Sequence, residues 1–578
     1  MKKYLSILLA LALMAGLLAG CGSSTDASAS AQAAPEVQEP EASSAEEAEA
    51  PQEPEASEPE PEASVQEPAA EEASVQEPEE PQEPEEEPFV YELPLTEGGE
   101  TLTMFAITNS NVTDNIGSLQ DHQIYQAAVE MTGVYVEIDA VMMETSNDQF
   151  ALVIASGDWP DMVRSANYPS GLTSAYEEEI VLDLADYMEF APNYSAILDQ
   201  NPKVAKDVKT DNGSILEMYF LNSYNGEFSV PLLEGPVIRE DLLSALGLQV
   251  PDTVDALHDT LSAFKAEYDL ADPLYVGNNA FAASGFLMGA FDASAELYQV
   301  DGQVKYGPAQ EGFRKYLETM TKWYSEGILN SDFYSYDDNP MSPVTESKKR
   351  DGDIGVFNAP ASNLAAYCSD TVNYVGMPIL GNDQGENHFI STIVVDTGKG
   401  MTITTTCSNI ELAVRWCDFW YSEPGRLLSN YGIEGVTFEY DEQGQPHWTD
   451  MLLNNAGGLS VGIARQCFVL LTQQPGVCPK EIEVSLLNEN SIAAVETWGQ
   501  VGDGAYAMPN VSLTADESSR AAQILSDLNT LNQETWNRIL MGQQSMDTWD
   551  QYLADIESMG ASEYAAIYQA AVDRYNSR

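Results

Sequence analysis

The chain has 578 residues and a formal net charge of −69, from 93 acidic and 24 basic residues. This length exceeds what one hydrophobic core usually organises, so the sequence predicts at least two lobes. The acidity argues against nucleic acid and other polyanions as partners, because like charges repel, and it leaves neutral or cationic small solutes as possible ligands.

The first 20 residues have the pattern of an export signal. Lys2 and Lys3 precede an apolar run of about 15 residues, which is too short to span a membrane, and the run ends in "LAGC" at 18–21. Small residues followed by cysteine resemble the bacterial lipobox, which implies cleavage after residue 20 and lipidation of Cys21. A plain signal peptide with an incidental cysteine is the alternative. Since no later segment has about 18 continuous apolar residues, we expect the rest to be soluble and held by lipid on the extracellular face of the cell membrane.

Residues 21–95 have the composition of a disordered acidic tether. They consist mainly of Glu, Pro, Ala, Ser and Gln, and "EASVQEP" occurs at 62–68 and again at 72–78. No basic residue lies between Lys3 and Arg164. Such a segment cannot bury enough apolar surface to offset its chain entropy. We therefore expect a spacer through the cell envelope, with an acidic interaction tail as the alternative.

From about residue 98, predicted strands and helices alternate. The predicted strands are "ETLTMFAI" at 100–107, "VYVEIDAV" at 134–141 and "DMVRS" at 161–165. Two predicted helices lie between them: one is closed by Gly133, and the other is capped by Asn147 or Asp148 and ends at Gly157. This alternation predicts a parallel sheet with right-handed crossovers.

The middle and the end of the chain predict further helices with an apolar stripe. Predicted helices cover 240–246, 253–268, 313–324, 408–425, 519–540, 548–560 and 562–576, and predicted strands cover 351–357 and 391–406. Thr514 and Glu517 have the spacing of a capping box. Trp323, Trp416 and Trp536 fall on helical stripes, so we expect them in the core.

The sequence has no convincing catalytic or metal-binding motif. "GLSVG" at 458–462 matches the serine-hydrolase elbow, but no histidine follows His447 to act as its base. The four histidines are scattered, and the five cysteines after Cys21 have no CxxC spacing. We therefore expect no catalytic residue, no metal site and no cofactor. We expect buried free thiols, with a disulfide between Cys467 and Cys478 as the alternative.

Five segments in order link this chain to a known family. They are "MTGVYVEID" at 131–139, "LVIASGDWPDMV" at 152–163, "VIREDLLSALGLQVPDTVDAL" at 237–257, the stretch from "AVRWCDFWYSEPG" to "HWTD" at 413–450, and the stretch from "WDQYLADIESMG" to "DRY" at 549–575. Together they resemble the extracellular solute-binding lipoproteins (family 1) of bacterial carbohydrate ABC transporters, in a long form common in Gram-positive bacteria. The sequence departs from the family at Glu240-Asp241-Leu242, where Lys-Asp-Trp is frequent.

The resemblance implies an α/β fold of the two-lobed periplasmic-binding-protein type II, with lobes joined by crossing strands and completed by C-terminal helices. We expect residues 96–228 and 396–505 to form lobe 1 of the solute-binding domain, and residues 229–395 and 506–578 to form lobe 2. In such a fold the ligand lies in the cleft between the lobes, which close over it.

The implied function is capture of a sugar, without catalysis, and its delivery to the permease subunits of an ABC importer. Acidity without a basic cluster fits a neutral oligosaccharide better than a uronate or a phosphate. We expect a monomer. A peptide or cationic solute is the alternative ligand, and a tethered extracellular hydrolase or a sensor or adhesin with the same fold are the alternative functions.

Candidate ligand contacts lie on loops of the predicted cleft. Aromatic faces stack on sugar C–H surfaces, and carboxylates or amides accept hydroxyl hydrogen bonds. The candidates are Trp159, Asp161, Tyr168, Tyr224, Asn225, Asn358, Trp498 and Tyr506. For each of them, packing at the surface or between the lobes is the alternative. Arg239 and Asp241 are instead expected to form a structural ion pair at the hinge.

Overall fold

In a computed structural model, the described residues are 91–164, 168, 171–276, 285–334, 343–469, 474–500 and 502–578. The predicted signal peptide, Cys21 and most of the predicted tether lie outside these ranges. The last residues of the predicted tether are described, and there Leu95 is buried and Tyr91 packs against the first hydrophobic core. These apolar side chains extend the folded part slightly upstream of the predicted boundary.

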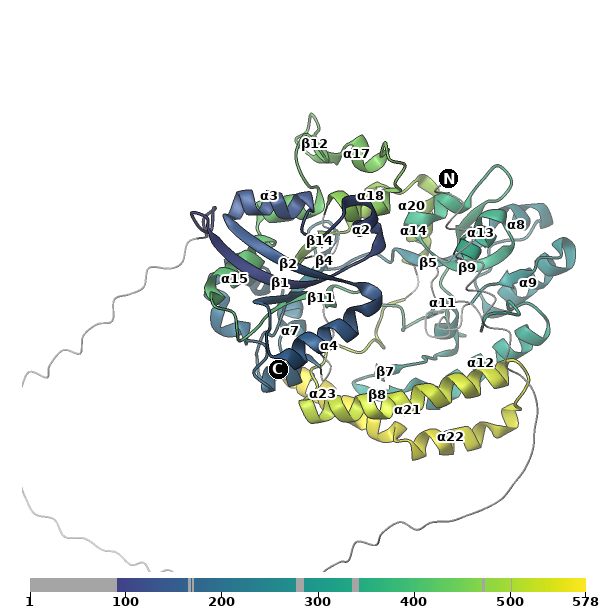
Figure 1. The fold of residues 1–578 in the computed structure, drawn as a ribbon. Coiled ribbons are helices and arrows are strands. Elements are labelled where there is room, and N and C mark those ends of the chain that lie inside the picture. Colours follow the sequence, from purple (N-terminus) through teal and green to yellow (C-terminus); the bar gives the residue numbers. More distant parts are fainter. Residues whose placement is uncertain are drawn as a thin grey trace, which may run out of the picture. The chain divides into compact units, whose positions relative to one another are not determined.

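The first lobe is built on a six-stranded sheet with the order β14-β4-β11-β3-β1-β2 (Figure 1). Its strands are β1 (Glu100–Thr108), β2 (Val134–Met142), β3 (Met162–Arg164), β4 (Met218–Ser223), β11 (Val395–Ile403) and β14 (Gly476–Pro479). β1 pairs in parallel with both β2 and β3, which confirms the predicted parallel arrangement at the start of the lobe. β11 runs antiparallel between β3 and β4, so the complete sheet is mixed.

Two helices connect the parallel strands, α3 (Gln123–Thr132) and α4 (Ser146–Ser156). They end at Gly133 and Gly157, which have left-handed φ angles of 75° and 72°, a conformation that glycine adopts at little cost. The predicted cap of α4 at Asn147 or Asp148 is wrong. The helix begins at Ser146, directly after a 3-10 turn, and Thr145 stands at the N-cap position without a side-chain hydrogen bond.

The second lobe is built on a four-stranded sheet with the order β10-β5-β9-β6. Its strands are β5 (Glu234–Arg239), β6 (Asp272–Leu274), β9 (Ile354–Pro360) and β10 (Tyr374–Gly376), and helices α8 (Glu240–Leu246), α9 (Val254–Tyr268), α12 (Glu311–Ser325) and α21 (Ala515–Leu540) belong to the same lobe. Trp323 of α12 and Trp536 of α21 lie in its core, as their helical stripes predicted.

The remaining elements complete the two lobes. In the first lobe these are α2 (Ser110–Ile116), α5 (Leu172–Glu177), α6 (Pro192–Gln200), α7 (Pro202–Asp207), α15 (Ile410–Phe419) and α16 (Glu423–Asn430). In the second lobe they are α11 (Gly285–Met288), β7 (Leu297–Val300), β8 (Gln303–Tyr306), α13 (Pro343–Asp351), α14 (Ala361–Leu364), α20 (Glu489–Trp498), α22 (Trp549–Ser558) and α23 (Ala561–Ser577). The 3-10 turns are Met143–Thr145, Leu184–Phe190, Gly289–Phe291, Gly307–Ala309, Ala365–Tyr367 and Met546–Thr548.

A small third core extends the first lobe. It is formed by β12 (Phe438–Tyr440), β13 (Pro446–Trp448), α17 (Asp450–Leu453), α18 (Val461–Phe468) and α19 (Glu481–Ser485). The "GLSVG" match falls here, at the start of α18, where Ser460 is the N-cap and accepts a hydrogen bond from the Ile463 amide. This serine therefore has a local structural role.

The C-terminal helices α21 and α23 pack on α12 and on the hairpin β7–β8 (Figure 1). Thr514 caps α21 and Glu517 completes the reciprocal bond, which confirms the predicted capping box. Among the described helices, none is long and apolar enough to cross a membrane.

The described part of the chain passes between the two sheets three times, through residues 224–233, 377–394 and 480–488. The third crossing ends at residue 488, whereas lobe 1 was predicted to end at residue 505. Ala494 and Trp498 of α20 pack in the second core, because α20 lies against β10 and β5. Helix α20 (Glu489–Trp498) thus lies with the second lobe, before the predicted boundary.

Candidate ligand-binding cleft

Three adjoining cavities surround residues 502–513, the segment that follows α20 and precedes α21. The hinge cavity has about 750 Å³, the acid cavity about 410 Å³ and the aromatic cavity about 620 Å³. The hinge cavity shares Pro509 with the acid cavity and Met508 with the aromatic cavity, and the last two share Tyr568. These shared walls make the three cavities one continuous candidate site.

The hinge cavity is lined by backbone that joins the lobes. Residues 230–232 and 390–395 of the first two crossings form its walls, together with residues 502–510. Asp207 of α7 closes it from the first lobe, and Tyr575 of α23 closes it from the second. The two side chains meet there, because the Tyr575 hydroxyl donates to the Asp207 carboxylate at 2.5 Å. Movement of one lobe against the other would therefore change the shape of this cavity.

The acid cavity brings the first sheet to the C-terminal part of the chain. Glu217, Tyr219 and Thr397 line it from the sheet, and residues 509–513 with Tyr568 line it from the opposite side. Glu217 is only 6% exposed, and burial raises the pKa of its carboxyl group to about 8. A buried acid with a shifted pKa in a cleft is typical of a functional site.

The aromatic cavity is lined by six rings, those of Tyr298, Tyr306, Phe389, Tyr506, Tyr564 and Tyr568. Tyr298 and Tyr506 are stacked, with ring centroids 6.1 Å apart. The edge of Phe389 meets both of them, at centroid distances of 5.1 and 5.3 Å. Such rings offer apolar faces beside hydroxyl groups, which suits a ligand that is apolar on one side and hydroxylated on the other.

Acids outnumber bases in the walls of these cavities. Among the described lining residues, the acids are Asp207, Glu217, Glu296 and Asp503, and the bases are Lys203 and Lys209. No arginine is among them. A cleft with this balance lacks the guanidinium clusters that usually bind carboxylates and phosphates.

The fold and the sequence can be compared with known proteins. No protein-family model matches the chain. The fructooligosaccharide ABC transporter substrate-binding protein FusA of Streptococcus pneumoniae is 22% identical over 494 residues, which cover 78% of this chain and 87% of FusA. Lipoprotein LipO of Bacillus subtilis is 22% identical over 54% of this chain and 63% of its own length.

Solved structures agree with these relatives. The alginate-binding protein AlgQ2 superposes with a TM-score of 0.68 at 21% identity, over 83% of this chain and 99% of AlgQ2. FusA in complex with kestose superposes with a TM-score of 0.66 at 20% identity, over 83% of this chain and all of FusA. The fold is that of the type II solute-binding proteins. The resemblance inferred from the five sequence segments is confirmed.

Two of the predicted ligand contacts line the cavities of this solute-binding fold. Trp498 lines the hinge cavity but is fully buried, and its indole N–H donates to the Pro236 carbonyl at 2.9 Å. A side chain at Gly235 of β5 would overlap the indole ring, so this strand packs directly on it. Tyr506 is half-buried in the aromatic cavity, and its ring lies 4.6 Å from that of His388.

Three other predicted contacts form hydrogen bonds within the first lobe. The indole N–H of Trp159 donates to the Ile154 carbonyl at the end of α4, at 3.1 Å. The carboxylate of Asp161 accepts from the amide and hydroxyl of Thr103, at 2.7 and 2.8 Å, and so joins β3 to β1. The hydroxyl of Tyr168 bonds that of Thr402 at 2.7 Å. Local packing accounts for these three side chains, and none of them lines the three cavities.

The last three predicted contacts also have local partners. Tyr224 and Asn225 form the turn at the first crossing. Asn225 has a φ of 51° there, and its backbone N–H donates to the Glu481 carboxylate. The amide of Asn358 donates to the Glu234 carboxylate at 2.6 Å. Their part in ligand binding stays a prediction.

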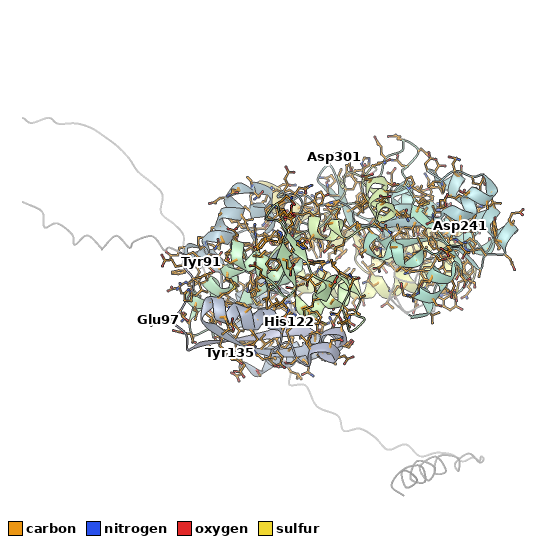
Figure 2. The ribbon with its side chains drawn as sticks, turned by 90° about the horizontal axis from the view of Figure 1, so that it is seen from above. Tyr91, Glu97, His122, Tyr135, Asp241 and Asp301 are labelled. Carbon is orange, nitrogen blue, oxygen red and sulfur yellow. The ribbon has the colours of Figure 1, made fainter. Side chains whose placement is uncertain are left out.

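The predicted ion pair is present, with Arg239 2.6 Å from Asp241. It lies where β5 ends and α8 begins, which is the end of β5 opposite the first crossing. Figure 2 shows Asp241 on the teal elements of the second lobe. The pair therefore fixes the start of α8, where an acid is also favoured by the helix dipole.

Sequence reasoning missed the residues that define the acid and aromatic cavities. Tyr298, Phe389 and Tyr568 come from a hairpin, a crossing and the last helix, and no local pattern connects them. Glu217 did carry a signal. It is the one charged residue in the otherwise apolar run "ILEMYFL" at 215–221, and an acid in such a run is either paired or functional.

The described residues show no group of three or more His, Cys, Asp or Glu side chains that could hold a metal ion. Cys368, Cys407, Cys417, Cys467 and Cys478 are free cysteines in the structure. The thiol of Cys467 donates to the Asn111 carbonyl at 3.4 Å, so it serves local packing in place of the alternative disulfide with Cys478.

Proposed function

We propose that this protein is a non-enzymatic substrate-binding protein of an ABC importer, which holds an oligosaccharide in the cleft formed by the hinge, acid and aromatic cavities. The observation that carries the proposal is the position of these cavities where the chain crosses between two lobes of the solute-binding fold. FusA, which is named for fructooligosaccharides, supports it as a relative across most of this chain. Delivery of the ligand to permease subunits follows from the same assignment.

The walls favour a neutral sugar over an anionic one. The rings of Tyr298, Tyr506 and Phe389 offer stacking surfaces for sugar C–H groups. Carboxyl groups such as that of Glu296 can accept hydroxyl hydrogen bonds. With four acids against two lysines among the described lining residues, a uronate or a phosphate would meet net repulsion. A cationic solute remains the alternative ligand that this charge would attract.

Anchoring at the cell membrane is part of the proposal. "LAGC" at 18–21 supports lipidation of Cys21, and the relative LipO is named as a lipoprotein. Residues 22–90 would then separate the binding lobes from the membrane by an acidic, proline-rich segment. The protein would thus work as a monomer on the extracellular face.

Calorimetric titration of residues 22–578 tests this function. The ligands are neutral oligosaccharides, oligouronates, peptides and polyamines. We expect a neutral oligosaccharide to bind with a Kd on the order of 1 µM, which is tight enough for capture and weak enough for release. Binding of peptides or polyamines alone would contradict the assignment, and breakdown of the bound sugar would favour a hydrolase.

Single substitutions locate the site. Tyr506→Ala and Tyr298→Ala each remove one stacking ring from the aromatic cavity, and we expect each to weaken saccharide binding by about tenfold. Tyr135→Ala is the matched control, because Tyr135 is 42% exposed on the edge strand β2, outside the three cavities (Figure 2). Equal affinities for all three variants would place the ligand elsewhere.

A further inference from the structure

Glu217 is built into the wall of the acid cavity. It directly precedes β4, and its neighbours in the sequence, Leu216 and Met218, are buried apolar residues. The side chain of Glu217 is also buried, yet it lines the cavity. A carboxyl group in this position meets both the protein interior and whatever occupies the cavity.

Gly400 of the neighbouring strand β11 makes the space for this carboxyl group. A Cβ at Gly400 would overlap the carboxyl atoms of Glu217, so only glycine leaves the side chain this position. The backbone of Gly400 also faces this carboxyl group, and it partly offsets the rise in the pKa of Glu217 that burial causes. The missing side chain at Gly400 therefore leaves room for the acid at the cavity wall.

No cation neutralises this acid. Among the described residues, no Lys, Arg or His nitrogen lies within 4.0 Å of the Glu217 carboxylate. Asp396 of β11 raises the pKa of Glu217 further, and Asp396 itself is paired with Lys399 at 2.8 Å. The other titratable groups around the site are Tyr168, Tyr194, Tyr219 and Tyr421, with Asp207 and Lys209 in the cavity walls.

These surroundings favour the neutral form of the acid. Burial is the largest cause, and it raises the pKa of Glu217 to about 8, so a large fraction of the molecules carries a proton there at neutral pH. A neutral carboxyl group is a hydrogen-bond donor as well as an acceptor, whereas a carboxylate only accepts.

We propose that Glu217 couples ligand capture to proton uptake, by donating a hydrogen bond from its protonated carboxyl group to an oxygen of an uncharged saccharide in the acid cavity. This inference rests on the proposed function. A ligand that expels water from the cavity removes solvation from the ionised form of Glu217 more than from the neutral form. The bound complex therefore holds the proton more tightly than the free protein, and binding takes up a proton.

The direction of proton exchange identifies the class of ligand. An uncharged saccharide stabilises the neutral form of Glu217 and causes uptake of a proton. A cationic solute would stabilise the carboxylate and cause release of a proton. The same measurement thus separates the two ligand classes that the charge of the cleft leaves open.

Titration calorimetry of residues 22–578 with the saccharide, in buffers of different ionisation enthalpy, measures this exchange. For the wild type we expect proton uptake that is absent near pH 5, about half a proton per ligand near pH 8 and larger at pH 9, and an affinity that falls by about tenfold from pH 7 to pH 9. Glu217→Gln keeps the shape and a donor but cannot titrate, so we expect neither proton uptake nor a fall in affinity. Glu439→Gln, at an exposed position of β12, is the control and should behave as the wild type.

Each result decides between the two proposals. Saccharide binding without proton uptake, or with uptake that persists in Glu217→Gln, overturns the role of Glu217 and leaves the proposed function intact. Failure of the wild type to bind any saccharide between pH 5 and pH 9 overturns the proposed function, and the role of Glu217 with it. If Glu217→Gln does not fold, the pH profile of proton uptake in the wild type still decides, because uptake that does not rise through pH 8 contradicts the assignment.

Discussion

The two lobes bury carboxyl groups in different ways. In the first lobe, Asp418 is fully buried, and its carboxylate accepts from the amides of Asn193 and Tyr194, with no cation within 4.0 Å among the described residues. Glu217 is also buried, and among the described residues no cation lies within 4.0 Å of its carboxyl group. In the second lobe, buried charges occur as ion pairs, such as Lys348 with Asp272 at 2.8 Å and Lys349 with Glu346 at 3.1 Å.

This difference makes the first lobe sensitive to pH. Burial raises the pKa of Asp418 to about 6 and that of Glu217 to about 8, because amides alone do not replace the water that the carboxylates lose. The unfolded chain releases these protons at about pH 4, whereas the folded lobe retains them to higher pH. Between those values the folded state binds more protons, so its stability falls as pH rises.

The largest expected effect is this loss of stability with rising pH. For Glu217 the rise in pKa from 4.5 to about 8 corresponds to a loss of about 5 kcal/mol in the free energy of unfolding as the pH rises through both values. Urea unfolding at pH 5 and pH 9 should show the wild type losing much more stability than Glu217→Gln. Hydrogen exchange should assign the loss to β4 and β11, while β5 and β9 stay protected. Equal losses of stability in the wild type and in Glu217→Gln would contradict the assignment of the pH sensitivity to Glu217 in the first lobe.

Truncation of Trp498 tests how far the second core extends. Trp498→Ala removes a fully buried indole between α20 and β5, so we expect a loss of about 4 kcal/mol in the free energy of unfolding, nearly equal at pH 5 and pH 9. Trp159→Ala is the matched comparison, because this indole is only half-buried and should cost less. Equal costs for the two variants would contradict the assignment of α20 to the second core.

Removal of the Asp418 carboxylate tests the amide-held acid directly. Asp418→Ala leaves the amides of Asn193 and Tyr194 without their acceptor, and we expect a loss of about 3 kcal/mol, measured by urea unfolding at pH 7. Asp199→Ala on the exposed face of α6 is the control and should leave stability unchanged. A loss no greater than that of the control would show that water replaces the carboxylate.

The smallest effect concerns the contact that α23 makes with the first lobe. Arg574 bonds Asp211 and Glu517, each at 2.6 Å, and this pairing raises its pKa. Because the side chain is about one-third exposed, Arg574→Gln should cost only about 1 kcal/mol, and less in high salt. Arg520→Gln, which breaks the exposed pair with Glu563, should leave the melting temperature unchanged. A salt-independent cost for Arg574→Gln would point to packing instead of charge.

Much of the fold could be predicted because its signals are local. The parallel strands β1, β2 and β3 and the helices α8 and α9 follow from apolar periodicity within short windows. Gly133 and Gly157 mark helix ends because few other residues adopt the left-handed conformation found there. The predicted cap of α4 was wrong because the 3-10 turn before it supplies the first turn without a capping side chain.

The site was less predictable, since it depends on contacts across the whole chain. The candidates were aromatic, acidic and amide residues on predicted loops, and of these Trp498 and Tyr506 line the cavities. Residues such as Asp161 also lie at strand ends, but there the carboxylate serves the backbone and hydroxyl of Thr103. A loop position alone does not say whether a polar group has a partner nearby.

The sequence by itself determined the solute-binding fold, the alternation of elements and the acidic composition, because each is encoded in neighbouring residues. Only the tertiary structure decided which side chains form the cleft. Glu217, Phe389 and Tyr568 are far apart in the sequence, and they line adjoining walls only after two sheets and the C-terminal helices have packed. Burial, which raises the pKa of Glu217, is likewise a property of the packed lobes and not of the strand that carries the residue.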